Sequence, residues 1–167
     1  MARQLRLITL WIFGEGFMVK IISGNLLDAK EDYICHQVNC QGVMGSGVAK
    51  AIRYKWPEVF TEYKSYIDMH FDTPLGSVCY ASINNSNQVV ANMFAQSSYG
   101  YDGKRYTSYD AFCNCLSVMS RDIPKSKTIA FPYKIGSDRG GANWNIIYTM
   151  ICEILGDWDI TIYKLEE

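Results

Sequence analysis

Two glycine-rich segments carry the residues with the clearest chemical potential. The first, HQVNCQGVMGSGVAKAI (36–52), has Gly45, Ser46 and Gly47 directly before a helical pattern, and the second is PYKIGSDRGGANW (132–144). Glycine lets backbone N–H groups approach a ligand without a Cβ in the way, and a helix N-terminus favours an anion. Each segment therefore suits a phosphate, and two such segments together suit a diphosphate.

The sequence lacks the patterns of several other kinds of site. Neither the dinucleotide-binding G-x-G-x-x-G nor the P-loop G-x-x-x-x-G-K-[ST] occurs in the required place. The six cysteines form no C-x-x-C pair and only two histidines are present, so we expect no metal and no cofactor. The scatter of the cysteines through apolar segments favours buried, reduced thiols and a cytoplasmic protein.

The charge of the chain limits its partners. A formal net charge of −1 gives no general attraction to nucleic acid or to an anionic membrane, although it leaves room for a local basic patch. We therefore expect no membrane partner and no general affinity for nucleic acid. We also expect the protein to be a monomer.

Strand-like and helix-like patterns alternate along the chain, which indicates an α/β sandwich with a mixed, largely parallel sheet. Strands are predicted at 19–22, 33–39, 76–83, 88–96, 128–132 and 159–165. Helices are predicted from Gly47 with an interruption at Pro57, after a capping box Thr107-x-x-Asp110, and over 144–155. Both glycine-rich segments lie between a strand and a helix, so they are expected at the same carboxyl rim of the sheet.

The first 17 residues differ from the rest. MARQLRLITLWIFGEGF carries two arginines and an apolar stretch, but no small-residue cleavage site follows it. Met18 then opens MVKIISGNLL, which is typical of a first strand. We expect 1–17 to come from an over-extended start codon or to be a disordered leader, in either case outside the fold, and 18–167 to form a single domain around one core.

Three blocks in this sequence resemble those of macro domains, the ADP-ribose-binding fold. They are GNLL (24–27), HQVNCQGVMGSGVAKAI (36–52) and PYKIGSDRGGANW (132–144). NMFAQSSYG (92–100) and RYTSYDAF (105–112) further resemble a small phage and bacterial branch described as ADP-ribose-1″-phosphate processing proteins. The resemblance runs from about Met18 to the end, and it implies a three-layer α/β/α sandwich.

The resemblance also implies where the diphosphate binds. The two loops that would hold it are Gly45, Ser46, Gly47, Val48 and Ala49 on one side, and Ile135, Gly136, Ser137 and Asp138 on the other.

Other positions are implied for the adenine and the distal ribose. Asn25 replaces an aspartate that in many members accepts a hydrogen bond from the adenine amino group, and Leu26 would add backbone and packing contacts. Asn39 is expected at the distal ribose, with a turn-forming role at the strand end as its alternative. Tyr99 or Tyr133 would cover that sugar.

Asp138 and His36 are the candidates for activating a water molecule. Asp138 would act as a general base, cap the helix that starts near Asn143, or pair with the neighbouring Arg139. His36 and Asn39 lie an odd number of residues apart, so His36 is a core residue unless a bulge or strand end brings both to the rim. In a mono-ADP-ribosyl hydrolase branch of the family, a lysine stands near the position of Gln96 and acts on the sugar. Glutamine cannot form the covalent intermediate that this lysine forms.

We therefore expect the chain to bind ADP-ribose and to hydrolyse ADP-ribose-1″-phosphate or a related linkage on the distal ribose. Three alternatives remain open: a non-catalytic ADP-ribose-binding module, a mono-ADP-ribosyl hydrolase, and a protein for another anion such as an RNA end. The expected location is the cytoplasm, which is that of the host cell if a phage encodes the protein.

Overall fold

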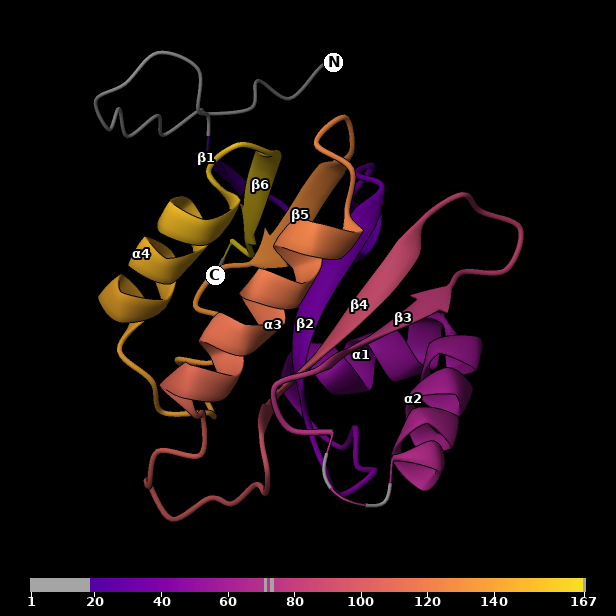
Figure 1. The fold of residues 1–167 in the computed structure, drawn as a ribbon, viewed down its shortest axis with the longest axis vertical. Helices are drawn as coiled ribbons and strands as arrows, with labels where there is room; N and C mark the ends of the chain where they lie inside the picture. Colours follow the sequence, from indigo (N-terminus) through magenta and orange to yellow (C-terminus); the bar gives the residue numbers. More distant parts are fainter. Residues whose placement is uncertain (1–18, 71, 73, 167) are drawn as a thin grey trace.

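A computed structural model describes residues 19–70, 72 and 74–166 (Figure 1). The predicted leader, 1–17, lies outside the described residues. The strands are β1 (Val19–Ser23), β2 (Tyr33–Asn39), β3 (Val78–Ser82), β4 (Val89–Gln96), β5 (Thr128–Pro132) and β6 (Asp159–Lys164). The helices are the short 3-10 helix η1 (Leu26–Asp28), α1 (Gly47–Lys55), α2 (Pro57–Met69), α3 (Tyr109–Asp122) and α4 (Trp144–Leu155).

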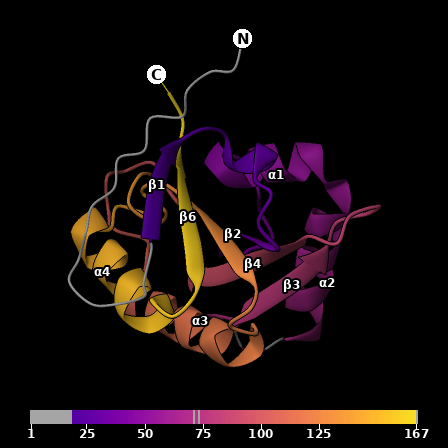
Figure 2. The ribbon, with the colours of Figure 1, turned by 90° about the horizontal axis from the view of Figure 1, so that it is seen from above.

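The described strands form one mixed sheet in the order β1-β6-β5-β2-β4-β3. The pairs β1–β6, β5–β6, β2–β5 and β2–β4 are parallel, and the edge strand β3 is antiparallel to β4. Helices α1 and α2 cover one face, and α3 and α4 cover the other (Figure 2). The predicted α/β/α sandwich is therefore confirmed.

Alternation along the central strands divides the buried side chains between the two faces of the sheet. On β2, Ile34 joins the cluster under α1 and α2, whereas its neighbour Cys35 joins the larger cluster under α3 and α4. Helix α1 ends before Pro57, which fits the first turn of α2 because a proline there loses no helical hydrogen bond.

One local prediction is wrong. The N-cap of α3 is Ser108, whose side chain accepts a hydrogen bond from the backbone N–H of Ala111, so Thr107 and Asp110 do not form the predicted capping box. Thr107 is buried and its hydroxyl bonds to a different loop.

Three further findings concern the cysteines, metal-binding groups and long apolar helices. The six cysteines all lie in the described part of the chain, where they are free thiols. Among the described residues, no group of three or more His, Cys, Asp or Glu side chains is placed to hold a metal ion. None of the described helices combines the length and the apolar character needed to span a membrane.

Candidate functional site

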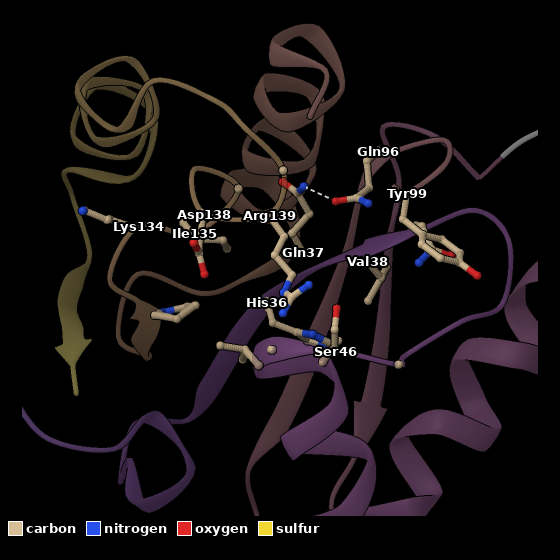
Figure 3. A pocket seen from close by; sticks show the side chains of 18 of the residues that line it. His36, Gln37, Val38, Ser46, Gln96, Tyr99, Lys134, Ile135, Asp138 and Arg139 are labelled. Carbon is tan, nitrogen blue, oxygen red and sulfur yellow. Dashed lines mark hydrogen bonds between the residues drawn. The ribbon is translucent and has the colours of Figure 1, made fainter. Parts of the chain in front are cut away.

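A cleft lies where three neighbouring strands, β2, β4 and β5, reach their carboxyl ends (Figure 3). It encloses about 980 Å³ of empty space, a figure that includes open solvent at its mouth. The predicted site residues that line it are His36, Asn39, Gly45, Ser46, Gly47, Val48, Ala49, Gln96, Tyr99, Tyr133, Ile135, Gly136 and Asp138. Both glycine-rich loops thus border one space, as parallel strand ends require.

The first loop leaves the N-terminus of α1 open towards this cleft. The first backbone bond of the helix is from Lys50 N–H to Ser46 C=O, so the preceding three N–H groups have no helical acceptor. Ser46 occupies the N-cap position but makes no side-chain capping bond. By contrast, Ser108 and Asn143 cap α3 and α4 with their own side chains. Helix α1 therefore presents unused donors and a positive dipole end.

The second loop follows β5 and also has open donors. Lys134 and Gly136 have positive φ values of 59° and 69°, which turn the chain sharply. Within the described structure, the N–H groups of Gly136, Asp138 and Arg139 donate to no acceptor, whereas that of Ser137 donates to Lys134 C=O. Successive backbone N–H groups in such a turn form a concave site for an anion.

A polar network that the sequence analysis missed supports this second loop. Gln37 Nε2 donates to Gln96 Oε1 at 2.6 Å (Figure 3). The same nitrogen donates to Thr107 Oγ1 at 2.8 Å. Thr107 Oγ1 in turn donates to Gly136 C=O at 2.8 Å. The network ties the ends of β2 and β4 to the turn, and Gln37 Oε1 is buried without a described partner.

Gly140 is required by close packing against that network. An added Cβ would lie 2.1 Å from Thr107 Oγ1 and 2.5 Å from Gly136 C=O. The carbonyl of Gly140 also accepts from the N–H groups of Tyr106 and Thr107. The position therefore favours glycine for lack of space, and the loop could not keep this path with a larger residue.

Asn39 lies at the rim, but its amide serves the first loop. Its Oδ1 accepts from the N–H of Gln41 at 2.9 Å and from Tyr63 OH at 3.0 Å, and its Nδ2 donates to Val43 C=O at 2.7 Å. Asn39 therefore has the turn-forming role at the strand end that was the alternative prediction for it. Its contact with a sugar remains a prediction.

His36 also lines the cleft, and its ring is buried. The register between β2 and β4 shifts between Val38 and Asn39, which is the kind of irregularity needed to bring His36 and Asn39 to one site. His36 Nε2 is 2.6 Å from Asn92 Oδ1, and Asn92 Nδ2 donates to Cys79 C=O. The oxygen of Asn92 therefore faces the His36 ring, and Nε2 is assigned the hydrogen. The lone pair on His36 Nδ1 then has no partner among the described residues.

Burial lowers the pKa of His36 to about 4, against an ordinary value of 6.5. Desolvation of the charged imidazolium is the larger cause, and the bond to Asn92 opposes it. The imidazole is consequently neutral near pH 7.

Asp138 lines the cleft with a carboxylate that has no hydrogen bond or ion pair to any described residue. Asn143 itself caps α4, and the guanidinium of Arg139 lies 5.1 Å from the ring centre of Tyr101. The two structural alternatives for Asp138, capping and pairing with Arg139, are therefore not observed.

Tyr99 and Tyr133 are the two aromatic residues that were predicted to cover a sugar. Tyr99 is 44% exposed, whereas Tyr133 packs edge-on against Trp144 with 5.2 Å between ring centres. Both line the cleft, from the segments that follow β4 and β5 respectively, and their contact with a bound sugar remains a prediction.

Three predicted residues lie outside the cleft lining. Asn25 Oδ1 caps η1 by accepting from the N–H of Leu27 at 3.0 Å, and Leu26 is buried. Ser137 turns its hydroxyl to Ile135 C=O. The Asn25 oxygen already accepts the hydrogen bond from the N–H of Leu27. Its bond to the adenine amino group remains a prediction.

The thiol of Cys40 stands at the start of the first loop. Its Sγ donates to Gln96 C=O at 3.5 Å, and burial raises its pKa to about 11. The thiol thus links the end of β2 to the end of β4.

Comparison with known proteins identifies relatives of this chain. A sequence model described as the Macro domain matches residues 35–151. The chain is 29% identical over 157 residues to an uncharacterized 17.5 kDa protein of Enterobacteria phage T4. The matched region covers 89% of this chain and 97% of that protein.

Two named enzymes match over shorter stretches. The DNA ADP-ribosyl glycohydrolase of Mycobacterium bovis is 43% identical over 47 residues, which are 28% of this chain and only 13% of that protein. The ADP-ribose 1″-phosphate phosphatase of Aspergillus clavatus is 36% identical over 62 residues, 36% of this chain and 29% of that protein.

The fold is similar to a solved structure. The macrodomain of Mycobacterium tuberculosis DarG superposes with a TM-score of 0.76 at 24% identity, covering 89% of this chain and 98% of that one.

Proposed function

Because the chain belongs to the macro domain family, we propose that its cleft binds ADP-ribose-1″-phosphate and hydrolyses it to ADP-ribose and phosphate. One observation carries the proposal: two sets of unused backbone donors border the same cleft, with the unpartnered Asp138 carboxylate beside them. The donors suit the diphosphate, and the carboxylate suits the activation of water.

The diphosphate would accept hydrogen bonds from the first turn of α1 and from Gly136 and Arg139 of the second loop. These donors are held in place before the ligand arrives, so little reorganisation is needed. Binding of the adenosine diphosphate part would then place the distal ribose and its phosphate at the loop end of the cleft.

Asp138 is our candidate for the general base. It would accept a proton from a water molecule that attacks phosphorus, while the bond between phosphorus and the ribose oxygen breaks. The same carboxyl group would return the proton to that oxygen, which completes a sugar hydroxyl and free phosphate. Arg139, next in the chain, offers a cation to offset the charge of the phosphate.

His36 has a weaker case as base. Its Nδ1 is unprotonated near pH 7, but a pKa of about 4 makes it a poor proton acceptor, and the atom is buried. We propose that His36 supports the floor of the cleft through Asn92.

A second candidate function is an ADP-ribose-binding module without turnover. It is favoured by Gln96, whose amide is engaged by Gln37 and by Ser98 C=O and supplies no nucleophile. The relative named DNA ADP-ribosyl glycohydrolase supports a third candidate, a mono-ADP-ribosyl hydrolase, which would release ADP-ribose from a larger molecule.

Calorimetry with ADP-ribose, paired with phosphate release from ADP-ribose-1″-phosphate, separates these functions. The proposal expects binding and release by the wild type, and a loss of release with retained binding in Asp138→Asn. Binding without release would select the module. The absence of both would reject ADP-ribose as ligand, and unchanged release by Asp138→Asn would reject Asp138 as base.

A further inference from the structure

A second hollow lies on the outer side of the first glycine-rich loop. It is lined by Met44, Gly45, Lys50, Arg53 and Tyr54. Gly45 also lines the main cleft, so the loop forms a wall between the two spaces. A molecule in this outer hollow would lie beside the proposed diphosphate site without entering it.

The outer hollow is locally basic in a chain whose net charge is only −1. Helix α1, GVAKAIRYK, has no acidic residue, and both Lys50 and Arg53 are exposed. Neither forms an ion pair with a described residue, whereas the next cation along, Lys55, pairs with Asp28. Lys64 of α2 lies close by, with its Nζ against Gly42 of the same loop.

An aromatic ring stands beside these cations. Tyr54 is 75% exposed, so core packing does not account for it. Lys50 Nζ lies 5.8 Å from its ring centre, and the Arg53 guanidinium lies 4.1 Å from the centre of Phe60, which holds the arginine against the helix surface. Two cations without an ion pair to any described residue and one exposed ring therefore line the same hollow.

We propose that this hollow binds single-stranded nucleic acid, with a backbone phosphate on Lys50 and Arg53 and a base on the ring of Tyr54. Sites for single strands combine cations that follow the backbone with aromatic side chains that stack on bases. An acidic peptide would use the cations but would not need the ring. This binding goes beyond the proposed hydrolysis and does not require it.

The test is fluorescence anisotropy with a labelled short oligothymidylate at about 50 mM salt, since phosphate contacts weaken steeply as salt rises. Lys50→Ala and Arg53→Ala should each weaken binding, and each should reduce the salt dependence by about 0.7 in the log–log slope. Tyr54→Ala should weaken binding by about tenfold, the effect of losing one stacked base. Tyr54→Phe, which keeps the ring, should bind as the wild type does.

Two controls make the result specific. Arg121→Ala removes an exposed cation from α3, on the opposite face of the sheet, and should leave oligonucleotide binding unchanged. Calorimetry with ADP-ribose on the same variants reports the main cleft separately, so a failure of either proposal can be recognised.

Two outcomes would overturn the inference. The first is no oligonucleotide binding by a protein that is folded by circular dichroism. The second is binding that Tyr54→Ala leaves unchanged and polyglutamate displaces as well as nucleic acid does, which would assign the hollow to acidic peptides.

Discussion

The open N-terminus of α1 leads to a prediction in which stability and binding change in opposite directions. Ser46→Asp places a carboxylate at the N-cap, where it can accept the N–H groups that Ser46 leaves unused. The same N–H groups are the proposed partners of the diphosphate. The substitution should therefore stabilise the ligand-free protein and weaken its binding of ADP-ribose.

The size of both effects follows from the geometry. A new capping bond and a favourable interaction with the helix dipole should together raise the free energy of unfolding by about 1–2 kcal/mol. A carboxylate and a phosphate about 5 Å apart repel each other by about 3 kcal/mol at an effective dielectric constant of about 20. The dissociation constant of ADP-ribose should accordingly rise on the order of a hundredfold.

Urea unfolding and calorimetry with ADP-ribose measure the two effects on the same samples. Ser46→Ala should change the free energy of unfolding by less than about 0.5 kcal/mol, because no capping bond is lost. Ser108→Ala should lower it by about 1 kcal/mol by removing the bond to Ala111 N–H, and should leave ADP-ribose binding intact. Wild-type affinity in a stabilised Ser46→Asp variant would refute the idea that these donors hold the ligand.

Three further predictions concern the supports of the cleft. Gly140→Ala should lower the free energy of unfolding by about 1–3 kcal/mol and weaken ADP-ribose binding, because its Cβ would crowd Thr107. In the control Gly103→Ala an added Cβ has open space, so this variant should affect stability alone. Equal losses of ADP-ribose binding in the two variants would contradict this reasoning. The folded-state pKa of His36, about 4, lies below the ordinary 6.5, so the unfolded chain takes up the proton first as the pH falls. The free energy of unfolding should therefore be highest above about pH 6.5 and should fall towards about pH 4. Urea titrations at several pH values should show a flatter slope for His36→Gln. Asn39→Ala should lower the free energy of unfolding of the ligand-free protein by about 1–3 kcal/mol, measured by urea unfolding, whereas a residue that serves the ligand alone would leave it unchanged.

The sequence predicted the fold and both loops because their signals are local. Gly45 and Gly47 before a helical pattern, and the run around Gly136 after an apolar strand, show where the chain turns. Parallel strands then bring such turns to one rim whatever the details of packing. Helix boundaries were less certain, since Thr107 and Ser108 are both good N-cap residues and only the path of the loop selects between them.

The network beneath the second loop was not predictable in the same way. Gln37 looks like a polar residue on a half-exposed strand, and only the pairing of β2 with β4 places it against Gln96. The shared placement of His36 and Asn39 likewise depends on a one-residue register shift, which no spacing in the sequence specifies. Asp138 was found because it is a carboxylate within a glycine-rich phosphate loop, but its lack of a partner is a property of the folded chain.

The thiol of Cys40 gives the first loop a built-in chemical reporter. With a pKa of about 11, very little of it is the reactive thiolate at neutral pH, and its hydrogen bond to Gln96 C=O holds it against the end of β4. Alkylation of this half-buried thiol should therefore be slow while that hydrogen bond holds. The rate of its reaction with a maleimide would report on the surroundings of this thiol, and a ligand that holds the first loop against the end of β4 should slow that reaction further.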